Sequence, residues 1–216
     1  MPDSQATPRI VLASSSPSRL SILRSAGVEP VVQVSGVDED AAMQRLIDEA
    51  ASQGRTPPPA EKVCHLAKAK ANAVLEDGLQ LGEGDVLIGG DSMLLLDGEL
   101  QGKPHTAEET VRRWQQQRGK RAELITGHAI YHDGHWFEGS SATSVFFADA
   151  SDKDIEAYAA SGEPWGCAGA FTLEALGGWF IDRIEGDPSS VIGLSLPLVR
   201  QALEHFGLSV SDFWNR

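Results

Sequence analysis

Residues 9–28 read RIVLASSSPSRLSILRSAGV and predict a strand, a serine-rich loop and a helix in immediate succession. The apolar run that ends at Ala13 is typical of a buried strand. Ser16 suits the N-cap of the following helix, Pro17 its first position and Gly27 its C-terminal stop. A strand that passes directly into a helix is the unit from which α/β folds are built.

The alternation of strand and helix continues along the chain. Further helices are expected at residues 60–75, 107–117, 152–160 and 196–206, and further strands at 31–34, in two segments within 85–96, in a long hairpin over 122–148, and at 178–186. Hairpins mixed with helical crossovers favour a mixed, twisted sheet flanked by helices over a purely parallel sheet. The sequence therefore predicts an α/β fold in a single domain that spans residues 1–216.

Composition and charge narrow the classes of protein. The formal net charge of −13 repels a nucleic-acid backbone, and the Lys and Arg residues form no basic stripe. No stretch reaches the roughly 20 consecutive apolar residues of a membrane span, and the first residues lack the features of a signal peptide. The two cysteines, Cys64 and Cys167, suggest neither a disulfide framework nor a zinc site. We therefore expect a cytoplasmic protein without nucleic-acid or membrane partners.

The segment LASSSPSR offers a place for an anion. It brings three successive hydroxyls, the free N–H groups of a helix N-terminus and Arg19 to one point of the chain. A helix N-terminus favours negative charge, and a guanidinium can bind phosphate oxygens in a bidentate manner. An ordinary capped helix with a surface arginine is the alternative interpretation.

The helix expected at residues 60–75 carries one lysine on its apolar face. Val63, Leu66 and Val74 define that face, and Lys70 falls on it, whereas Lys68 points elsewhere. A lysine in an apolar stripe must either extend its amine to solvent or meet an anion. Both interpretations of Lys70 remain open at this point.

Asp91 is the strongest single signal, because it lies between two apolar segments in VLIGGDSMLLLDG. A buried carboxylate must be hydrogen-bonded, face a cleft or hold a metal ion. The preceding Gly89 and Gly90 allow a ligand to approach the backbone closely. A tight turn into the next strand is the competing explanation.

Two further charged residues complete the inventory. Lys103 lies in GKP, where it can project from a rigid turn, and Glu39 lies in the acidic VDED. With Asp91, Lys70 and Arg19 they give two carboxylates, two lysines and an arginine, which suit a metal-assisted attack on a polyphosphate. The acidic run around Glu39 could equally be a solvated surface.

In chain order, the motifs LASSSPSR, VDED, LAKAKA, GGDS with DGELQGKP, TGHAI, AGAF and IEGDPSSVIGLSLP resemble those of the Maf family of nucleotide pyrophosphatases. The match spans nearly the whole chain. The resemblance implies an elongated α/β fold of two lobes with a central cleft, similar to inosine triphosphate pyrophosphatases. It also implies hydrolysis of a nucleoside triphosphate to the monophosphate and pyrophosphate, an activity compatible with clearing non-canonical nucleotides.

The resemblance also implies roles for individual residues. Asp91 would be the catalytic acidic residue that orients or deprotonates the attacking water, and Glu39 would help it to hold Mg²⁺ or Mn²⁺. The residues around the triphosphate would be Ser14, Arg19, Lys70 and Lys103, of which the two lysines assist catalysis.

Three departures from the family pattern concern the base. The chain has SPSR where SPRR or SPWR is common, so that a small hydroxyl, Ser18, is expected beside the base. It has GGDS in place of GADT and CAGAFTLEALG in place of a segment with AGAYGIQG, so that Ser92 and Glu174 occupy the discriminating positions. A glutamate can accept hydrogen bonds from base N–H groups, which suits guanine-like edges, but it does not identify one base.

Two other functions are compatible with parts of the sequence. The family is also called septum formation inhibitor, which suggests a non-enzymatic regulator of cell division that binds a partner protein. A binding module, however, has no need for the converging charged residues described above. A phosphatase that removes the terminal phosphate would use similar groups. A homodimer is expected from the resemblance alone.

Overall fold

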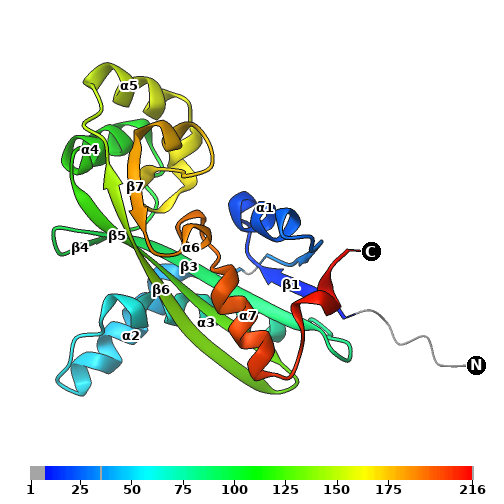
Figure 1. Cartoon of the computed structure of the whole chain (residues 1–216). Coiled ribbons are helices and arrows are strands. Elements are labelled where there is room, and N and C mark those ends of the chain that lie inside the picture. Colours follow the sequence, from blue (N-terminus) through cyan, green and yellow to red (C-terminus); the bar gives the residue numbers. More distant parts are fainter. Residues whose placement is uncertain (1–7, 35, 216) are drawn as a thin grey trace, which may run out of the picture. The chain divides into compact units, whose positions relative to one another are not determined.

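The computed structural model describes residues 8–34 and 36–215. In chain order the elements, shown in Figure 1, are β1 (Ile10–Ala13), α1 (Pro17–Ser25), β2 (Val31–Val32), α2 (Glu39–Ser52), α3 (Pro59–Glu76), β3 (Val86–Leu96), β4 (Glu99–Gln101), α4 (Ala107–Gln117), β5 (Arg121–His132), β6 (His135–Phe147), α5 (Asp152–Ala160), η1 (Glu163–Gly166), η2 (Ala168–Ala170), η3 (Leu176–Phe180), β7 (Ile181–Glu185), α6 (Pro188–Ile192), α7 (Leu196–His205) and η4 (Val210–Phe213), where η denotes a short 3₁₀ helix.

The strands form one mixed sheet, as the sequence predicts. Its order is β2-β1-β3-β5-β6-β7, and β4 pairs with β3 outside this path. β1 is parallel to both β2 and β3, whereas β4 pairs with β3, and β7 with β6, in antiparallel fashion. The expected mixed α/β fold is therefore confirmed. No helix in the described ranges is long and apolar enough to cross a membrane.

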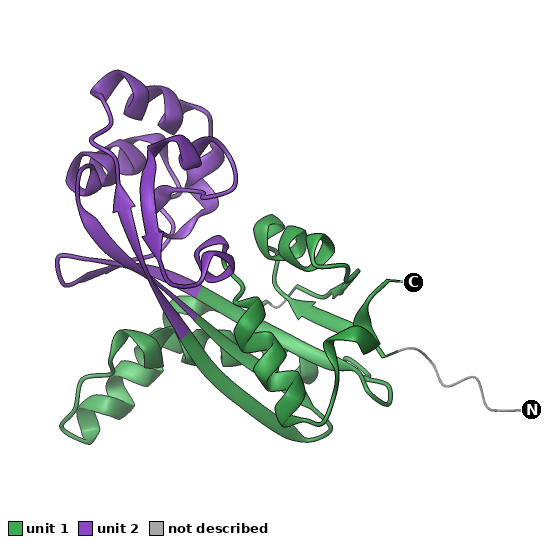
Figure 2. Cartoon of the chain, viewed as in Figure 1, with its two compact units in different colours: residues 1–91, 127–140, 193–216 green, residues 92–126, 141–192 purple. Residues whose placement is uncertain are grey.

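The chain divides into two compact units, coloured separately in Figure 2. Unit 1 comprises Met1–Asp91, Gly127–Ser140 and Gly193–Arg216, and unit 2 comprises Ser92–Thr126 and Ser141–Ile192. Strands β3, β5 and β6 each contribute residues to both units. Two compact units agree with the two lobes that the resemblance implies, whereas the single domain, the elongated shape and the central cleft stay predictions.

In unit 1, α3 lies directly against the sheet because two strand residues have no side chain. A Cβ on Gly89 in β3 would lie 2.1 Å from the carbonyl oxygen of Ala67, and a Cβ on Gly127 in β5 would lie 2.4 Å from the α3 backbone. The next residue, His128, accepts a hydrogen bond at Nε2 from the backbone N–H of Ser195, the N-cap of α7 (2.9 Å). Because successive strand residues face opposite ways, α3 and α7 cover opposite faces of the sheet.

Unit 2 has an aromatic core. Trp114 of α4 is fully buried and makes edge-on ring contacts with Phe147, Tyr158 and Phe180, at centroid distances of 5.4–5.7 Å. Its indole N–H donates to the carbonyl of Ala170 at 2.7 Å. The burial of the large ring and the hydrogen bond of its N–H fix α4 against η2.

Several boundaries differ from the sequence predictions. The segment expected as two strands around GGDS is the single strand β3, so the alternative of a tight turn at Asp91 is wrong. The strand expected at residues 31–34 is limited to Val31–Val32, whose side chains are exposed. Five residues of the strand expected at 178–186 form β7, which η3 precedes. Ser16 does cap α1, as predicted, with its hydroxyl accepting from the N–H of Arg19.

We predict that Gly89→Ala lowers the free energy of unfolding by about 1–3 kcal/mol, because the added methyl overlaps helix backbone that cannot rotate away. Gly36→Ala is the matched control, since a Cβ there meets no atom of residues 8–34 or 36–215 within 4 Å. Urea unfolding of both variants measures the difference. Equal stability of the two variants would show that α3 does not lie against β3 at this distance.

Candidate active site

The charged residues of unit 1 gather where β1 ends beside β3. The parallel pairing of β1 and β3 stops at Ala13 and Gly89. Beyond this point β3 continues to Gly90 and Asp91, whereas the segment after β1 turns into the serine loop. Gly89 faces α3 and Gly90 faces α1, where a Cβ would lie 3.2 Å from Nε of Arg19. Asp91, the next residue in the alternation, faces α3 again.

Lys70 of α3 meets Asp91 at this point. Its Nζ donates to Oδ1 of Asp91 at 2.7 Å and forms a second ion pair with Oε1 of Glu39 at 3.0 Å. The side chains of Lys70 and Asp91 are only 9% and 10% exposed. The amine therefore meets anions inside the protein and does not extend into solvent.

The neighbouring Lys68 behaves differently, as the helix-face argument predicts. It forms a surface ion pair with Glu138 at 2.6 Å, in which both side chains are more than a third exposed. The prediction that only one of these two lysines lies on the buried face is confirmed.

Glu39 is placed by the start of α2. Asp38 is the N-cap, and its carboxylate accepts from the N–H of Ala41 at 2.9 Å, so that the helix begins at Glu39. Glu39 is 46% exposed, in contrast to Asp91. The three acidic residues thus differ in what they do: Asp38 caps α2, Glu39 pairs with Lys70, and Asp40 is exposed.

Arg19 is buried beside the same group. Its Nε donates to the carbonyl of Gly193 at 2.7 Å and its Nη1 to Oγ of Ser14 at 3.1 Å. Burial lowers the pKa of Arg19, and the negative charges of Asp91 and Glu39 oppose that effect. The alternative of a surface arginine is therefore wrong.

The carboxylates beside Lys70 are candidate ligands for a divalent metal ion. Oδ2 of Asp91 is buried without a hydrogen-bond partner in the part of the chain that the structure describes. Among these residues, no group of three or more His, Cys, Asp or Glu side chains is arranged to hold a metal. Mg²⁺ is commonly bound by one or two carboxylates together with waters and substrate phosphates. Asp91 with Glu39 fits an ion bound in that way.

Three other predicted site residues, Lys103, Glu174 and Ser92, belong to unit 2. Lys103 is exposed on the segment after β4, and Glu174 is exposed after η2. Burial, followed by the negative charges of Glu174 and Glu163, raises the pKa of Cys167 to about 11, and Lys103 partly opposes this rise. Lys103 and Glu174 therefore lie near the same thiol.

Ser92 has a structural partner. The hydroxyl of Thr126 donates its one proton to the carbonyl of Ser190 at 2.8 Å, so Ser92 is the donor in the 2.9 Å bond between the Ser92 and Thr126 hydroxyls. This bond orients Ser92 toward the neighbouring strand. Its proposed part in base discrimination stays a prediction.

The structure thus brings together the predicted residues of unit 1: Ser14, Arg19, Glu39, Lys70 and Asp91. Ser18 lies in the first turn of α1 and is half-buried. Sequence reasoning assigned no role to Gly193, whose carbonyl holds Arg19. A backbone acceptor leaves no residue-type signal, although its motif was among those that carry the resemblance.

Comparisons with known proteins agree with this arrangement. A family model described as Maf-like protein matches residues 9–206. Proteins named nucleoside triphosphate pyrophosphatase are 64% identical in Corynebacterium aurimucosum, over 95% of this chain and 98% of the relative, and 63% identical in Corynebacterium efficiens, over 96% and 100%. A relative of the same name in Rhodococcus opacus is 53% identical, over 94% and 95%.

Among solved structures, the Staphylococcus aureus Ham1 protein is remotely similar, with a TM-score of 0.39 and 15% identity over 66% of this chain and 73% of that one. The sequence relatives are far closer and extend over nearly their full lengths. With residues 9–206 matched by the family model, this chain belongs to the Maf-like protein family.

Proposed function

We propose that this protein is a nucleoside triphosphate pyrophosphatase that cleaves its substrate between the α- and β-phosphates. The observation that carries the proposal is the buried Lys70 between Asp91 and Glu39, beside the serine loop that holds Arg19. Relatives at 63–64% identity that carry this name support it.

Asp91 is the residue that we assign to the attacking water. One carboxylate oxygen is held by Lys70, so the group has a fixed orientation, and the buried second oxygen has an unused lone pair. That oxygen can accept a hydrogen bond or a proton from water as it attacks the α-phosphate. The bond to the bridging oxygen then breaks, and pyrophosphate leaves.

The cations stabilise the charge that moves onto the leaving group. Lys70 can transfer a hydrogen bond from a carboxylate to a phosphate oxygen, because one of its two partners, Glu39, is itself half-exposed and can be replaced by the substrate. Arg19 donates from Nε to Gly193 and from Nη1 to Ser14. We assign to it positive charge beside the substrate and the orientation of the Ser14 hydroxyl. Lys103 is proposed as a further phosphate contact.

Asp91 and Glu39 are the residues that would hold Mg²⁺ or Mn²⁺. A bound divalent ion supplies charge neutralisation across the phosphate oxygens. The orphaned oxygen of Asp91 and the half-exposed carboxylate of Glu39 support this assignment.

The direct test is a panel of canonical, methylated and deaminated nucleoside triphosphates, assayed with each metal. We expect pyrophosphate and the nucleoside monophosphate as first products. Orthophosphate as the first product would identify a phosphatase instead. No turnover of any nucleotide with either metal would favour a partner-binding role.

Asp91→Asn should lower kcat by roughly 100- to 10,000-fold, because an amide cannot act as a general base. The variant keeps a side chain of nearly the same shape, so circular dichroism should show an unchanged fold. If the folded variant retained more than about a tenth of wild-type kcat, Asp91 would not be the catalytic base.

Lys70→Ala should lower kcat/KM by about 100-fold or more, since it removes a cation from the transition state. Lys68→Ala, from the same helix, should change it less than about fivefold, because exposed ion pairs contribute little. Loss of Lys70 also leaves the buried Asp91 without its cation. Both variants are therefore assayed without urea, at a temperature at which their thermal unfolding curves show them to be folded. Equal losses at the two positions would contradict the site.

Glu39→Gln should raise the Mg²⁺ concentration that gives half-maximal activity by about tenfold or more, because one metal-binding carboxylate is lost. The adjacent exposed Asp40 supplies the control variant, Asp40→Asn. Metal titrations of the two enzymes measure the contrast. Identical metal dependence in both variants would rule out Glu39 as a ligand.

We assign the choice of base to Glu174, with Ser18 and Ser92 as further contacts. Glu174→Gln exchanges an acceptor-only group for one that donates and accepts, so it should change the ratio of kcat/KM values between nucleotides. A uniform loss for all nucleotides would place Glu174 in the catalytic or structural apparatus.

A further inference from the structure

Unit 2 contains a hydrogen-bonded cluster that the proposed mechanism does not use, centred on the carboxylate of Glu163. Its Oε1 accepts from the hydroxyls of Tyr158 (3.1 Å) and Thr172 (2.5 Å) and from the N–H of Gly177 (3.0 Å). Its Oε2 accepts from the N–H of Leu176 at 3.1 Å. One side chain at the start of η1 thus binds four donors: Tyr158 in α5, Thr172 in the loop after η2, and the first two residues of η3.

The donors around Glu163 are also hydrogen-bonded to one another. The Tyr158 hydroxyl accepts from the N–H of Thr172 at 3.2 Å, and the Thr172 hydroxyl accepts from the N–H of Gly177 at 3.2 Å. A Cβ on Gly177 would lie 2.5 Å from the Tyr158 oxygen, so no side chain fits there. Burial alone would raise the pKa of Glu163, but hydrogen bonds from Thr172 and the loop N–H groups outweigh it and lower the pKa. The Glu163 side chain at the centre of the cluster is therefore an ionised carboxylate.

Glu174 lies in the middle of the loop that this carboxylate holds. Thr172 and Leu176, two residues before and two after Glu174, both donate to Glu163. The N–H of Leu173 donates to the carboxylate of Glu174 itself at 3.1 Å. The position of the Glu174 side chain therefore depends on a loop that is fixed on both sides.

The same region is tied to the segment that carries Lys103. The N–H of Gly169 donates to the carbonyl of Gly102 at 3.2 Å, and the N–H of His105 donates to the carbonyl of Trp165 at 3.0 Å. Lys103 lies between Gly102 and His105. Two backbone bonds thus connect the lysine segment with η2 and with η1.

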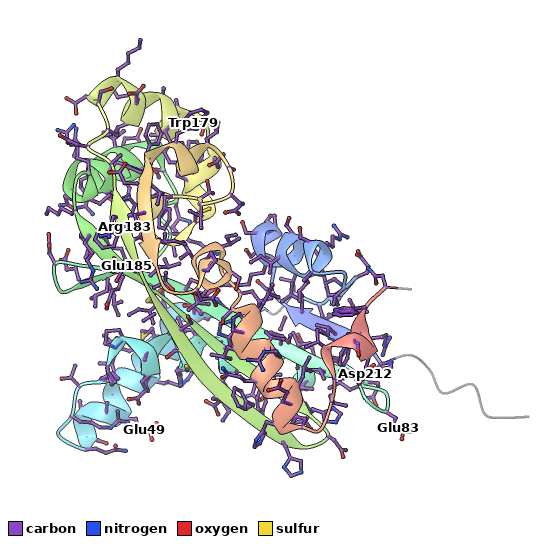
Figure 3. All side chains as sticks on the ribbon, viewed as in Figure 1. Glu49, Glu83, Trp179, Arg183, Glu185 and Asp212 are labelled. Atoms are coloured by element: carbon purple, nitrogen blue, oxygen red, sulfur yellow. The ribbon has the colours of Figure 1, made fainter. Side chains whose placement is uncertain are left out.

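The backbone here also stores strain. Ala170 has φ of +59°, in the left-handed region that disfavours a side chain, and the indole of Trp114 holds its carbonyl. Strained residues of this kind tend to occur at functional sites. At the end of the loop Trp179 is 84% exposed and projects from unit 2 in Figure 3. The strained segment therefore leads to the surface of the unit.

We propose that Glu163 is a positioning residue for nucleotide selection, which fixes the loop that presents Glu174 to the base. The inference rests on the proposed function. The four hydrogen bonds join α5, the loop after η2 and the start of η3 to one partly buried carboxylate, so together they restrict the loop that carries Glu174. What it provides is a single loop geometry.

The test is Glu163→Gln, compared with Glu156→Gln at an exposed position of α5. The amide keeps one oxygen but places an NH₂ group against the N–H of Leu176, so the loop loses one bond. We expect the kcat/KM ratio between the best and the poorest nucleotide to change by about tenfold or more, chiefly through KM. Amide hydrogen exchange at Leu176 and Gly177 should accelerate, whereas the Glu156 variant should resemble wild type in both measurements.

Two variants of Thr172 provide a second test in case Glu163→Gln does not fold. Thr172→Val removes the hydroxyl with little change of shape and should alter selection as Glu163→Gln does, while Thr172→Ser keeps the donor and should retain wild-type ratios. A uniform change for all nucleotides would overturn the selection role, and so would unchanged ratios. Unchanged exchange at Leu176 and Gly177 in Glu163→Gln would overturn the positioning role alone. A wild-type protein that hydrolyses no nucleotide would instead contradict the proposed function.

Discussion

The contact between α3 and β3 at Gly89 determines where the charged residues of unit 1 meet. The carbonyl of Ala67 lies where a side chain on Gly89 would stand. From Ala67 to Lys70 the helix advances about 4.5 Å on the same face. From Gly89 to Asp91 the strand advances about 6.6 Å, also on the same face. A glycine opposite an alanine therefore brings a lysine opposite an aspartate, and the observed ion pair follows.

The two units use charged side chains in different ways. In unit 1, the cation of Lys70 is shared between buried Asp91 and half-exposed Glu39, and one oxygen of Asp91 has no hydrogen-bond partner among the described residues. Such a group contributes little to stability and is suited to exchange partners with a charged ligand. In unit 2, both oxygens of Glu163 are fully engaged within the protein. The first arrangement suits chemistry and the second suits the fixing of a loop.

The sequence predicted the features that follow from periodicity or residue type. Helical spacing placed Lys70 on the buried face of α3, and local chemistry placed the cap at Ser16. The continuity of β3 was missed because Gly-Gly-Asp-Ser has the composition of a turn, and here the glycines serve to admit α3 and Arg19 instead. The Glu163 cluster was missed because its donors are backbone and hydroxyl groups in a loop without any period. The roles given to Lys103 and Glu174 come from the family resemblance, since unit 2 residues carry no pattern that names a ligand.

In the proposed reaction, water activated at Asp91 attacks the α-phosphate. Hydrolysis of a nucleoside triphosphate in ¹⁸O-labelled water, followed by mass spectrometry of both products, tests this step directly. The account predicts that one labelled oxygen appears in the nucleoside monophosphate and none in pyrophosphate. Label in pyrophosphate or in orthophosphate would mean that another phosphorus is attacked, and would contradict the account.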